Sequence, residues 1–276
     1  MVDGPVIGVA LKVVPLRVSV DPLTGLTEVQ ARSHGCSRAD EAALERALRL
    51  ATEWGAGVLV ASAGDEQCMP VLRNALAVGA AKAVHVPLAP DAPSAEVARA
   101  LAAVLRGCTL VLCGDHSLDR GSGSVPAFLA HELGVAQALG LTELAAVSTG
   151  KLDALRRLDG GRRERLSVGT PAVVSVETGS VRLRRAALSA LLAAGGVRTA
   201  AKAAQHAAGL EPLRLPYRPR AKALHRPPAQ LGARQRILDL TGALVERTPP
   251  KVVRTDDPAQ AADELLEFLT RHGYLP

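Results

Sequence analysis

Four short apolar runs alternate with four segments of helical period along the first half of the chain. Each run is rich in Val, Leu and Ala, whereas each following segment repeats apolar residues at every third or fourth position. Strands that are apolar throughout and alternate with helices pair in parallel through right-handed crossovers. The sequence therefore predicts an α/β fold with a doubly wound, mostly parallel sheet. The predicted strands are Val6–Leu11, Gly57–Ala61, Ala83–Leu88 and Thr109–Cys113.

The pattern changes from Leu141 onward. Two strand-like pieces, Leu144–Ser148 and Leu166–Val168, flank the charged turn Asp159-Gly160-Gly161. This arrangement predicts a hairpin. Pro171–Val176 is a further apolar run and is expected to form another buried strand.

The last third of the chain has a different composition. Residues 198–232 carry five prolines among basic residues, which predicts an extended arm. Two helical patterns follow, Ile237–Leu244 and Ala259–His272. We therefore expect an α/β domain over residues 1–197, an extended arm over 198–232 and a helical C-terminal extension over 233–276.

The loop after the fourth strand is the strongest candidate for a site. Gly121, Ser122, Gly123 and Ser124 precede a helix that begins at Val125. Small residues here leave backbone N–H groups unpaired at a helix start, where the helix dipole favours an anion. The loop matches neither GxGxxG nor GxxxxGK[ST], and Gly and Ser also serve simply to cap helices, so both interpretations stay open.

Two more loops are expected at the same edge of the sheet. They follow the first and second strands, at Ala10–Lys12 and Ser62–Gly64. The carboxyl ends of parallel strands meet at one edge, where α/β sheets bind ligands. Together with Gly114–Val125, these loops predict a phosphate or nucleotide site.

The composition of the chain excludes further classes of function. Lys and Arg exceed Asp and Glu by 33 to 27, but the excess is spread out without heptads or finger spacing. Aromatic residues make up 2%, which argues against base stacking and a single-strand nucleic-acid binder. No triad, metal motif or paired carboxylates can be assigned, so we expect no metal and no catalytic residue. His116 is either a proton shuttle or a hydrogen-bonding loop residue.

The four cysteines and the chain's beginning bear on location. Cys36, Cys68, Cys108 and Cys113 form no CxxC and are expected to be reduced, buried thiols. No apolar run approaches the roughly 20 residues that cross a bilayer, and no signal peptide is recognised. We therefore expect a cytoplasmic protein without membrane insertion.

Five stretches occur in a fixed order along the chain. They are VALKVV (Val9–Val14), SRADEAALERALRL (Ser37–Leu50), RNALAVGAAKAVHV (Arg73–Val86), GDHSLDRGSGSVPAFLAHELG (Gly114–Gly134) and PAVVSVE (Pro171–Glu177). These stretches resemble one family, the β subunits of electron transfer flavoproteins. The resemblance implies a Rossmann-like α/β fold of the adenine-nucleotide-binding type. The tail is similar to an actinobacterial form of the family associated with mycofactocin systems.

The resemblance implies an electron carrier rather than an enzyme. It implies a heterodimer whose α subunit holds most of the FAD site, while the β subunit binds AMP or, in bifurcating members, a second FAD. Dehydrogenases are the implied electron donors. The implied cofactor-binding residues are Ala10, Ser37, Arg38, Ala39, Asp40, Ala63, Gly114, Asp119, Gly121, Ser122, Gly123, Ser124 and Val125.

The family's partner-recognition segment resembles Arg184–Ser189. The resemblance makes Leu188 the anchor, with Arg185 and Ala186 beside it; the alternative is that Leu188 is a core residue of an amphipathic segment. Departures from the family pattern are Ser37 for Asn, Ala63 for Cys and His116 for Gln, and most of the lysine run after the anchor is missing. These leave open which nucleotide binds and which dehydrogenases dock.

Two other classes of function remain. A stand-alone ATP-binding regulatory domain has a similar fold and would need no α subunit. Nucleic-acid binding through the basic arm between Arg198 and Arg236 would show a steep dependence on salt.

Overall fold

The computed structural model describes residues 4–21, 23–30, 33–179, 181–201, 227–241 and 252–275. The chain divides into two compact units, Met1–Gly209 and Leu210–Pro276. The second unit contains α6 (Ala233–Thr241) and α7 (Pro258–Arg271). Both helices overlap the two helical patterns of the tail, and α7 begins at the N-cap Asp257, whose carboxylate accepts the N–H of Ala259. Most of the predicted arm, from 202 to 226, lies outside the described residues.

One large sheet organises the first unit. Within the described residues its order is β11-β10-β9-β12-β8-β1-β6-β7-β13. The strands are β1 (Val6–Ala10), β6 (Gly57–Gly64), β7 (Lys82–Pro87), β8 (Leu110–Gly114), β9 (Ala136–Ser148), β10 (Lys151–Arg157), β11 (Arg163–Gly169), β12 (Ala172–Val176) and β13 (Arg198–Thr199).

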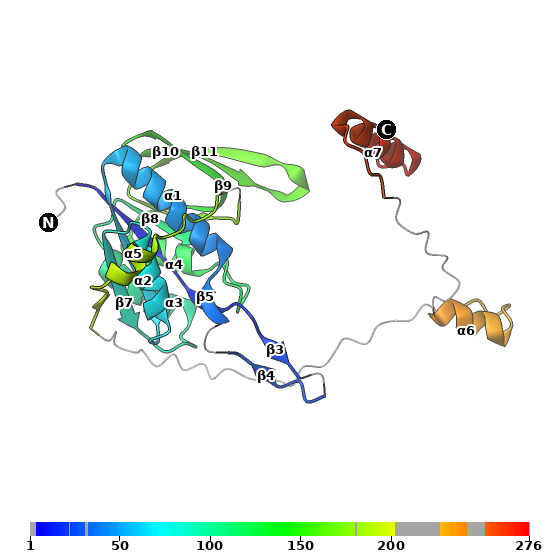
Figure 1. The fold of residues 1–276 in the computed structure, drawn as a ribbon, viewed down its shortest axis with the longest axis horizontal. Coiled ribbons are helices and arrows are strands. Elements are labelled where there is room, and N and C mark those ends of the chain that lie inside the picture. Colours follow the sequence, from blue (N-terminus) through cyan, green and yellow to red (C-terminus); the bar gives the residue numbers. More distant parts are fainter. Residues whose placement is uncertain are drawn as a thin grey trace. The chain divides into compact units, whose positions relative to one another are not determined.

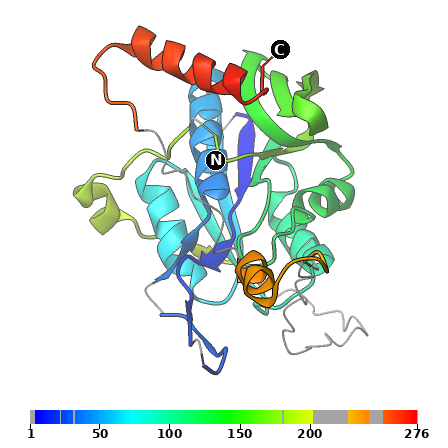
Figure 2. The ribbon, with the colours of Figure 1, turned by 90° about the vertical axis from the view of Figure 1, so that its right-hand side faces the viewer.

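Two short antiparallel pairs connect β1 to the first helix. β2 (Val13–Pro15) pairs with β5 (His34–Cys36), and β3 (Ser19–Val20) pairs with β4 (Thr27–Glu28). The β3–β4 ribbon, drawn in blue, extends away from the sheet in Figures 1 and 2.

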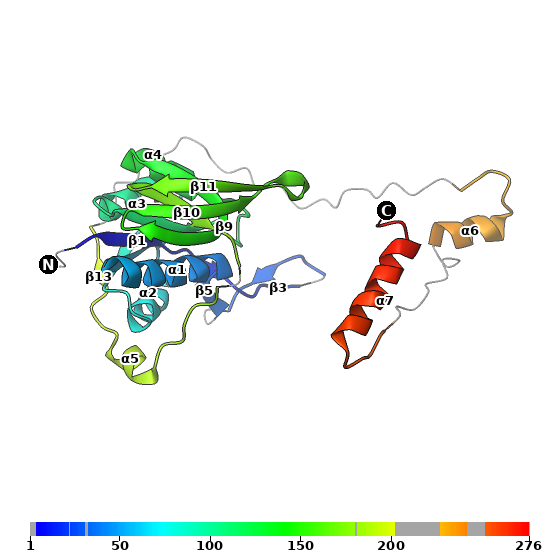
Figure 3. The same ribbon diagram turned by 90° about the horizontal axis from the view of Figure 1, so that it is seen from above.

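Helices cover both faces of the sheet (Figure 3). α1 (Arg38–Trp54) and α2 (Cys68–Ala77) pack on one face, against a core that includes Ile7 and Val9 of β1. α3 (Ser94–Leu105) and α4 (Val125–Leu133) pack on the other face, over Ala10. The doubly wound, mostly parallel α/β fold expected from the sequence is confirmed.

Helix α1 is capped at both ends by residues that adjoin it in the sequence. The Ser37 hydroxyl accepts the N–H of Asp40 at 3.1 Å, which caps the helix. Gly55 ends it in the left-handed conformation, at φ 61°, which glycine adopts without steric penalty. These caps fix where α1 meets the carboxyl edge of the sheet.

The parallel strands define a topological switch point. β1 pairs with β6 on one side and with β8 on the other, and all three run in parallel. The chain winds outward to β6 and β7 and then returns to β8 and β12, so the connections diverge between β1 and β8. A crevice outside the carboxyl ends of such strands is where open α/β sheets bind ligands.

The predicted hairpin is wrong in its pairing. β9 does not pair with β11; the intervening strand β10 pairs with both, and the turn Asp159–Gly161 joins β10 to β11. The sequence KLDALRR did not indicate strand β10, because Leu152 and Ala154 are its only buried residues and charged residues flank them. The result is a three-stranded antiparallel extension.

Candidate functional site

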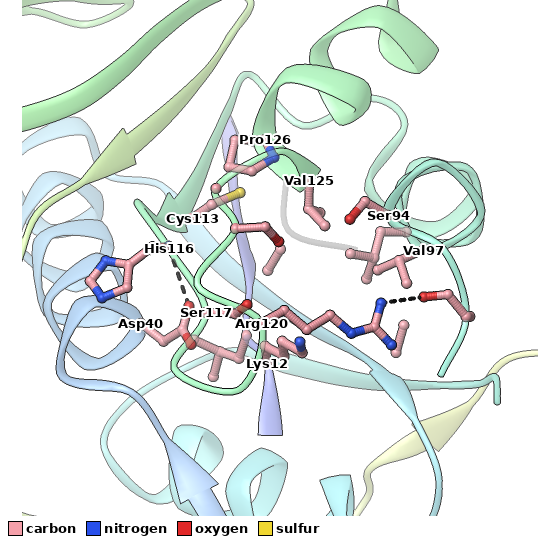
Figure 4. A pocket seen from close by; sticks show the side chains of 18 of the residues that line it. Lys12, Asp40, Ser94, Val97, Cys113, His116, Ser117, Arg120, Val125 and Pro126 are labelled. Atoms are coloured by element: carbon pink, nitrogen blue, oxygen red, sulfur yellow. Dashed lines mark hydrogen bonds between the residues drawn. The ribbon is translucent and has the colours of Figure 1, made fainter. Parts of the chain in front are cut away.

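A cavity of about 90 Å³ lies at the carboxyl ends of β1 and β8, on the switch point (Figure 4). Its deepest walls are buried residues, among them Ala10, Leu101 and Cys113. Its outer lining includes Lys12 and Arg120, whose side chains contact solvent. The cavity therefore has a mainly apolar interior and a charged mouth.

The cavity brings together about half of the residues that the sequence singled out. Six others lie in the same two segments, the start of α1 and the loop after β8, without lining the cavity. Their roles in binding stay predictions. The lining members are Ala10, Asp40, Ala63, Gly114, Ser122, Gly123 and Val125, and the others are Ser37, Arg38, Ala39, Asp119, Gly121 and Ser124.

A fourth loop lines the cavity, and the sequence patterns did not predict it. It joins β7 to α3 and contributes Ala89, Pro90, Ala92 and Ser94. β7 is the parallel neighbour of β6, so its carboxyl end reaches the same edge. The run of Ala, Pro, Asp and Ser between the third strand and the third helix was the available signal.

Asp40 joins the start of α1 to the end of β8. Its carboxylate accepts the Ser37 hydroxyl at 3.0 Å and the Gly114 N–H at 3.3 Å. A Cβ at position 114 would lie 2.7 Å from Asp40 Oδ1, so only glycine allows this close approach. Burial raises the pKa of Asp40 to about 7, although these hydrogen bonds act in the opposite direction.

Two side chains fasten the loop after β8. Lys12 Nζ lies 2.7 Å from both carboxylate oxygens of Asp119, which links the loop to the end of β1. Burial opposes the charged form of Asp119, but the hydrogen bond and the charge of Lys12, together with further hydrogen bonds in the loop, outweigh it and lower the pKa of Asp119. Arg120 donates to the carbonyls of Ala92 and Pro90 at 2.9 and 3.1 Å, which links the loop to the β7–α3 connection.

The end of this loop presents hydrogen-bond donors. The backbone N–H groups of Ser122, Gly123, Ser124 and Val125 have no acceptor among the described residues. Ser124 precedes α4 without a side-chain cap. Unpaired donors at the start of a helix suit an anion such as phosphate.

His116 lies on the cavity wall beside Asp115. Its Nδ1 is 2.8 Å from the Asp115 carboxylate, so the imidazole has a hydrogen-bond partner within its own loop. All four cysteines are free thiols, and burial raises the pKa of each. Within the residues described, no three His, Cys, Asp or Glu side chains gather as a metal site would require.

The predicted docking segment lies apart from the cavity, around α5 (Leu188–Ala193). Leu188 is 72% exposed, so the alternative that it is a core residue is wrong. Arg185 is exposed, whereas Ala186 packs against the core. Whether the segment docks a partner stays a prediction.

No helix among the described residues has both the length and the apolar character to cross a membrane.

The fold and the cavity define a doubly wound α/β domain of the kind that binds ligands at the carboxyl edge of its sheet. The electron transfer flavoprotein domain model matches residues 27–207. The chain therefore belongs to the electron transfer flavoprotein family, and the resemblance to its β subunits is confirmed.

Three relatives illustrate the similarity. The chain is 37% identical over 152 residues to electron transfer flavoprotein subunit beta of Mycobacterium tuberculosis (strain H37Rv), which covers 50% of this chain and 54% of that protein. It is 33% identical over 172 residues to the Syntrophomonas wolfei protein of that name, covering 60% and 67%. It is 34% identical over 145 residues to the mitochondrial subunit beta of Oryza sativa subsp. japonica, covering 50% and 56%. The chain thus spans about half the length of the mycobacterial relative.

Proposed function

We propose that this chain is the β subunit of a heterodimeric electron transfer flavoprotein. In this proposal it pairs with an α subunit that holds most of the FAD site and carries electrons from a dehydrogenase to an acceptor. The cavity at the switch point holds AMP. The observation that carries the proposal is this cavity, with its unpaired backbone donors, in a chain of this family.

The lining fits an adenine nucleotide in its chemistry. Val97, Leu101 and Val125 offer apolar walls for a base. The free N–H groups of residues 122–125 and the guanidinium of Arg120 offer donors for phosphate oxygens. The remaining lining between the apolar wall and these donors includes Asp40, Ala63 and Gly114. The nucleotide would contribute to the structure of the site, whereas FAD, when bound, would accept and donate the electrons.

The docking segment supports an electron-carrier role. Leu188 and Leu192 lie one helical turn apart on α5, and both are largely exposed, at 72% and 81%. An exposed leucine pair on a segment tied to the domain is suited to a transient partner. We propose that it docks the dehydrogenase. A cytoplasmic location and the link to mycofactocin systems remain parts of this proposal.

The test is to co-express the full chain with a candidate α subunit and to identify the nucleotides that the purified complex releases. One FAD and one AMP per heterodimer is the expected result. Two FAD would replace the AMP assignment by a bifurcating carrier. A chain that purifies alone and binds or hydrolyses ATP would overturn the proposal in favour of the regulatory domain.

A further inference from the structure

The two cations at the mouth of the cavity have different electrostatic environments. Lys12 is held by both oxygens of Asp119, so a carboxylate neutralises its charge. Arg120 forms no ion pair with any described residue, and its acceptors are the neutral carbonyls of Pro90 and Ala92. Arg120 therefore carries an unbalanced positive charge on the cavity lining.

The guanidinium of Arg120 also keeps unused donors. It has five N–H bonds in a planar fork, and the two carbonyl contacts use one on each terminal nitrogen. The remaining donors can bind an anion while the carbonyl contacts persist. The carbonyls fix the fork across the gap between the loop after β8 and the β7–α3 connection (Figure 4).

The size of the cavity places the polar end of a bound ligand near the guanidinium of Arg120. Sites that enclose a small molecule usually have a volume of about 300–1,000 Å³. This cavity measures about 90 Å³, and its depth is formed by buried, mostly apolar residues. An apolar portion of a nucleotide fits inside, and the phosphate must then lie toward the exposed mouth, where Arg120 is.

We propose that Arg120 is a specificity-determining residue that recognises the phosphate of the nucleotide bound in this cavity. The inference rests on the proposed function, which places an adenine nucleotide there. A charge-assisted bond to phosphate is stronger than a bond between neutral groups, so Arg120 favours phosphorylated ligands over the corresponding nucleosides. The phosphate can belong to AMP or to the diphosphate of FAD.

A purely structural role makes a different prediction. If Arg120 only ties the loop after β8 to the β7–α3 connection, its loss loosens the site for every ligand. Adenosine and AMP would then lose affinity by the same factor. If Arg120 reads the phosphate, AMP loses affinity and adenosine does not.

The experiment measures binding of adenosine, AMP and FAD to the full chain by calorimetry, after co-purifying nucleotide has been removed. The variants are Arg120→Ala, Arg120→Lys and the control Arg106→Ala. Arg106 is an exposed arginine at the other end of α3. The fluorescence of Trp54, the only tryptophan in the chain, checks that each variant is folded.

Arg120→Ala should weaken the affinity for AMP about 10- to 100-fold and change the affinity for adenosine by less than about threefold. Arg120→Lys should be intermediate because it keeps the charge but not the planar fork. The wild-type chain could bind FAD more tightly than AMP and lose affinity for both by the same factor in Arg120→Ala. That result would identify the diphosphate of FAD as the recognised group. Added salt should weaken AMP binding more in the wild type than in Arg120→Ala.

Equal losses for adenosine and AMP, or AMP binding unchanged in Arg120→Ala, would overturn the role of Arg120 while leaving the nucleotide site intact. A wild-type chain that binds none of the three ligands would overturn the nucleotide site itself, and the role of Arg120 with it.

Discussion

Arg184 binds the carboxylate of Glu45 through three N–H groups. Its backbone N–H and Nε donate to Oε2 at 3.1 and 2.9 Å, and Nη2 donates to Oε1 at 3.1 Å. Arg49 adds a further bond to Oε1 at 2.9 Å. The Glu45 side chain is only 5% exposed, so its carboxylate is largely shielded from water, while the Arg184 side chain is 44% exposed. The ion pair fastens the segment before α5 to α1 and leaves Leu188 in solvent.

Replacing Glu45 by Gln should lower the free energy of unfolding by about 1.5–3 kcal/mol at pH 7, since charge-assisted bonds are lost. Burial opposes the charged form of Glu45, but the bonds from Arg184 and Arg49 outweigh it and lower its pKa from 4.5 to about 2. The stabilisation is therefore complete above pH 4.5 and is lost as the pH falls toward 2. Urea unfolding followed by Trp54 fluorescence between pH 2.5 and 7 measures this.

A matched control for Glu45→Gln is Arg49→Ala. The Arg49 side chain is 56% exposed, so this change removes a solvent-screened pair and should lower stability by less than about 1 kcal/mol. Equal effects of the two variants would contradict a dominant role for Arg184.

Asp40 should make the domain less stable as the pH rises from about 4 to 7. Burial raises its pKa from 3.8 to about 7, so in this range the folded state binds a proton that the unfolded state has lost. The free energy of unfolding should fall with a slope of up to about 1.4 kcal/mol per pH unit relative to Asp40→Asn, whose side chain does not titrate. Denaturant unfolding of both proteins at pH 4.5, 6 and 8 tests this, and parallel pH profiles would refute it.

Gly123 should not tolerate a side chain. A Cβ there would collide with the carbonyl oxygen of Asp115, a backbone atom that cannot move without shifting the loop. We expect Gly123→Ala to cost about 1–3 kcal/mol and to abolish AMP binding.

Gly121→Ala separates this collision from ordinary strain in the backbone. Gly121 has φ 61°, but nothing lies within 4 Å of an added Cβ. We expect a smaller cost, about 1 kcal/mol, with AMP still bound. Calorimetry and unfolding on both variants give the comparison, and AMP binding retained by Gly123→Ala would contradict the geometry of the loop.

Leu188→Ala should impair docking without impairing folding. A side chain that is 72% exposed contributes little to stability, so the free energy of unfolding should change by less than about 0.5 kcal/mol. Because Leu188 is the proposed docking anchor, its loss should raise the KM of the partner dehydrogenase for this electron carrier at least about tenfold. The kcat of the dehydrogenase should stay unchanged.

The control for Leu188→Ala is Leu23→Ala, on the loop between β3 and β4, where the side chain is 94% exposed. It should leave both KM and kcat unchanged. If the two variants behave alike, Leu188 is not the anchor.

The cavity was only partly predictable from the sequence. Its small and glycine residues after β1, β6 and β8 stood out because local patterns mark the ends of strands. Pro90, Ala92 and Arg120 did not, because only the pairing of β7 beside β6 brings the β7–α3 connection to this edge. In the same way, no local pattern joins Glu45 to Arg184, because the two residues lie 139 positions apart in the chain.

What the sequence by itself determined is the alternation of strands and helices in the first half of the chain, the caps of α1 and the fold class. These depend on neighbours within a few residues, and their patterns survive in the linear chain. What only the tertiary structure decided is which distant groups meet: the β9–β10–β11 pairing, the burial of Asp40 against Gly114, and the unbalanced charge of Arg120. Burial and ion pairing depend on the whole packed surface around a group, and no local pattern records that surface.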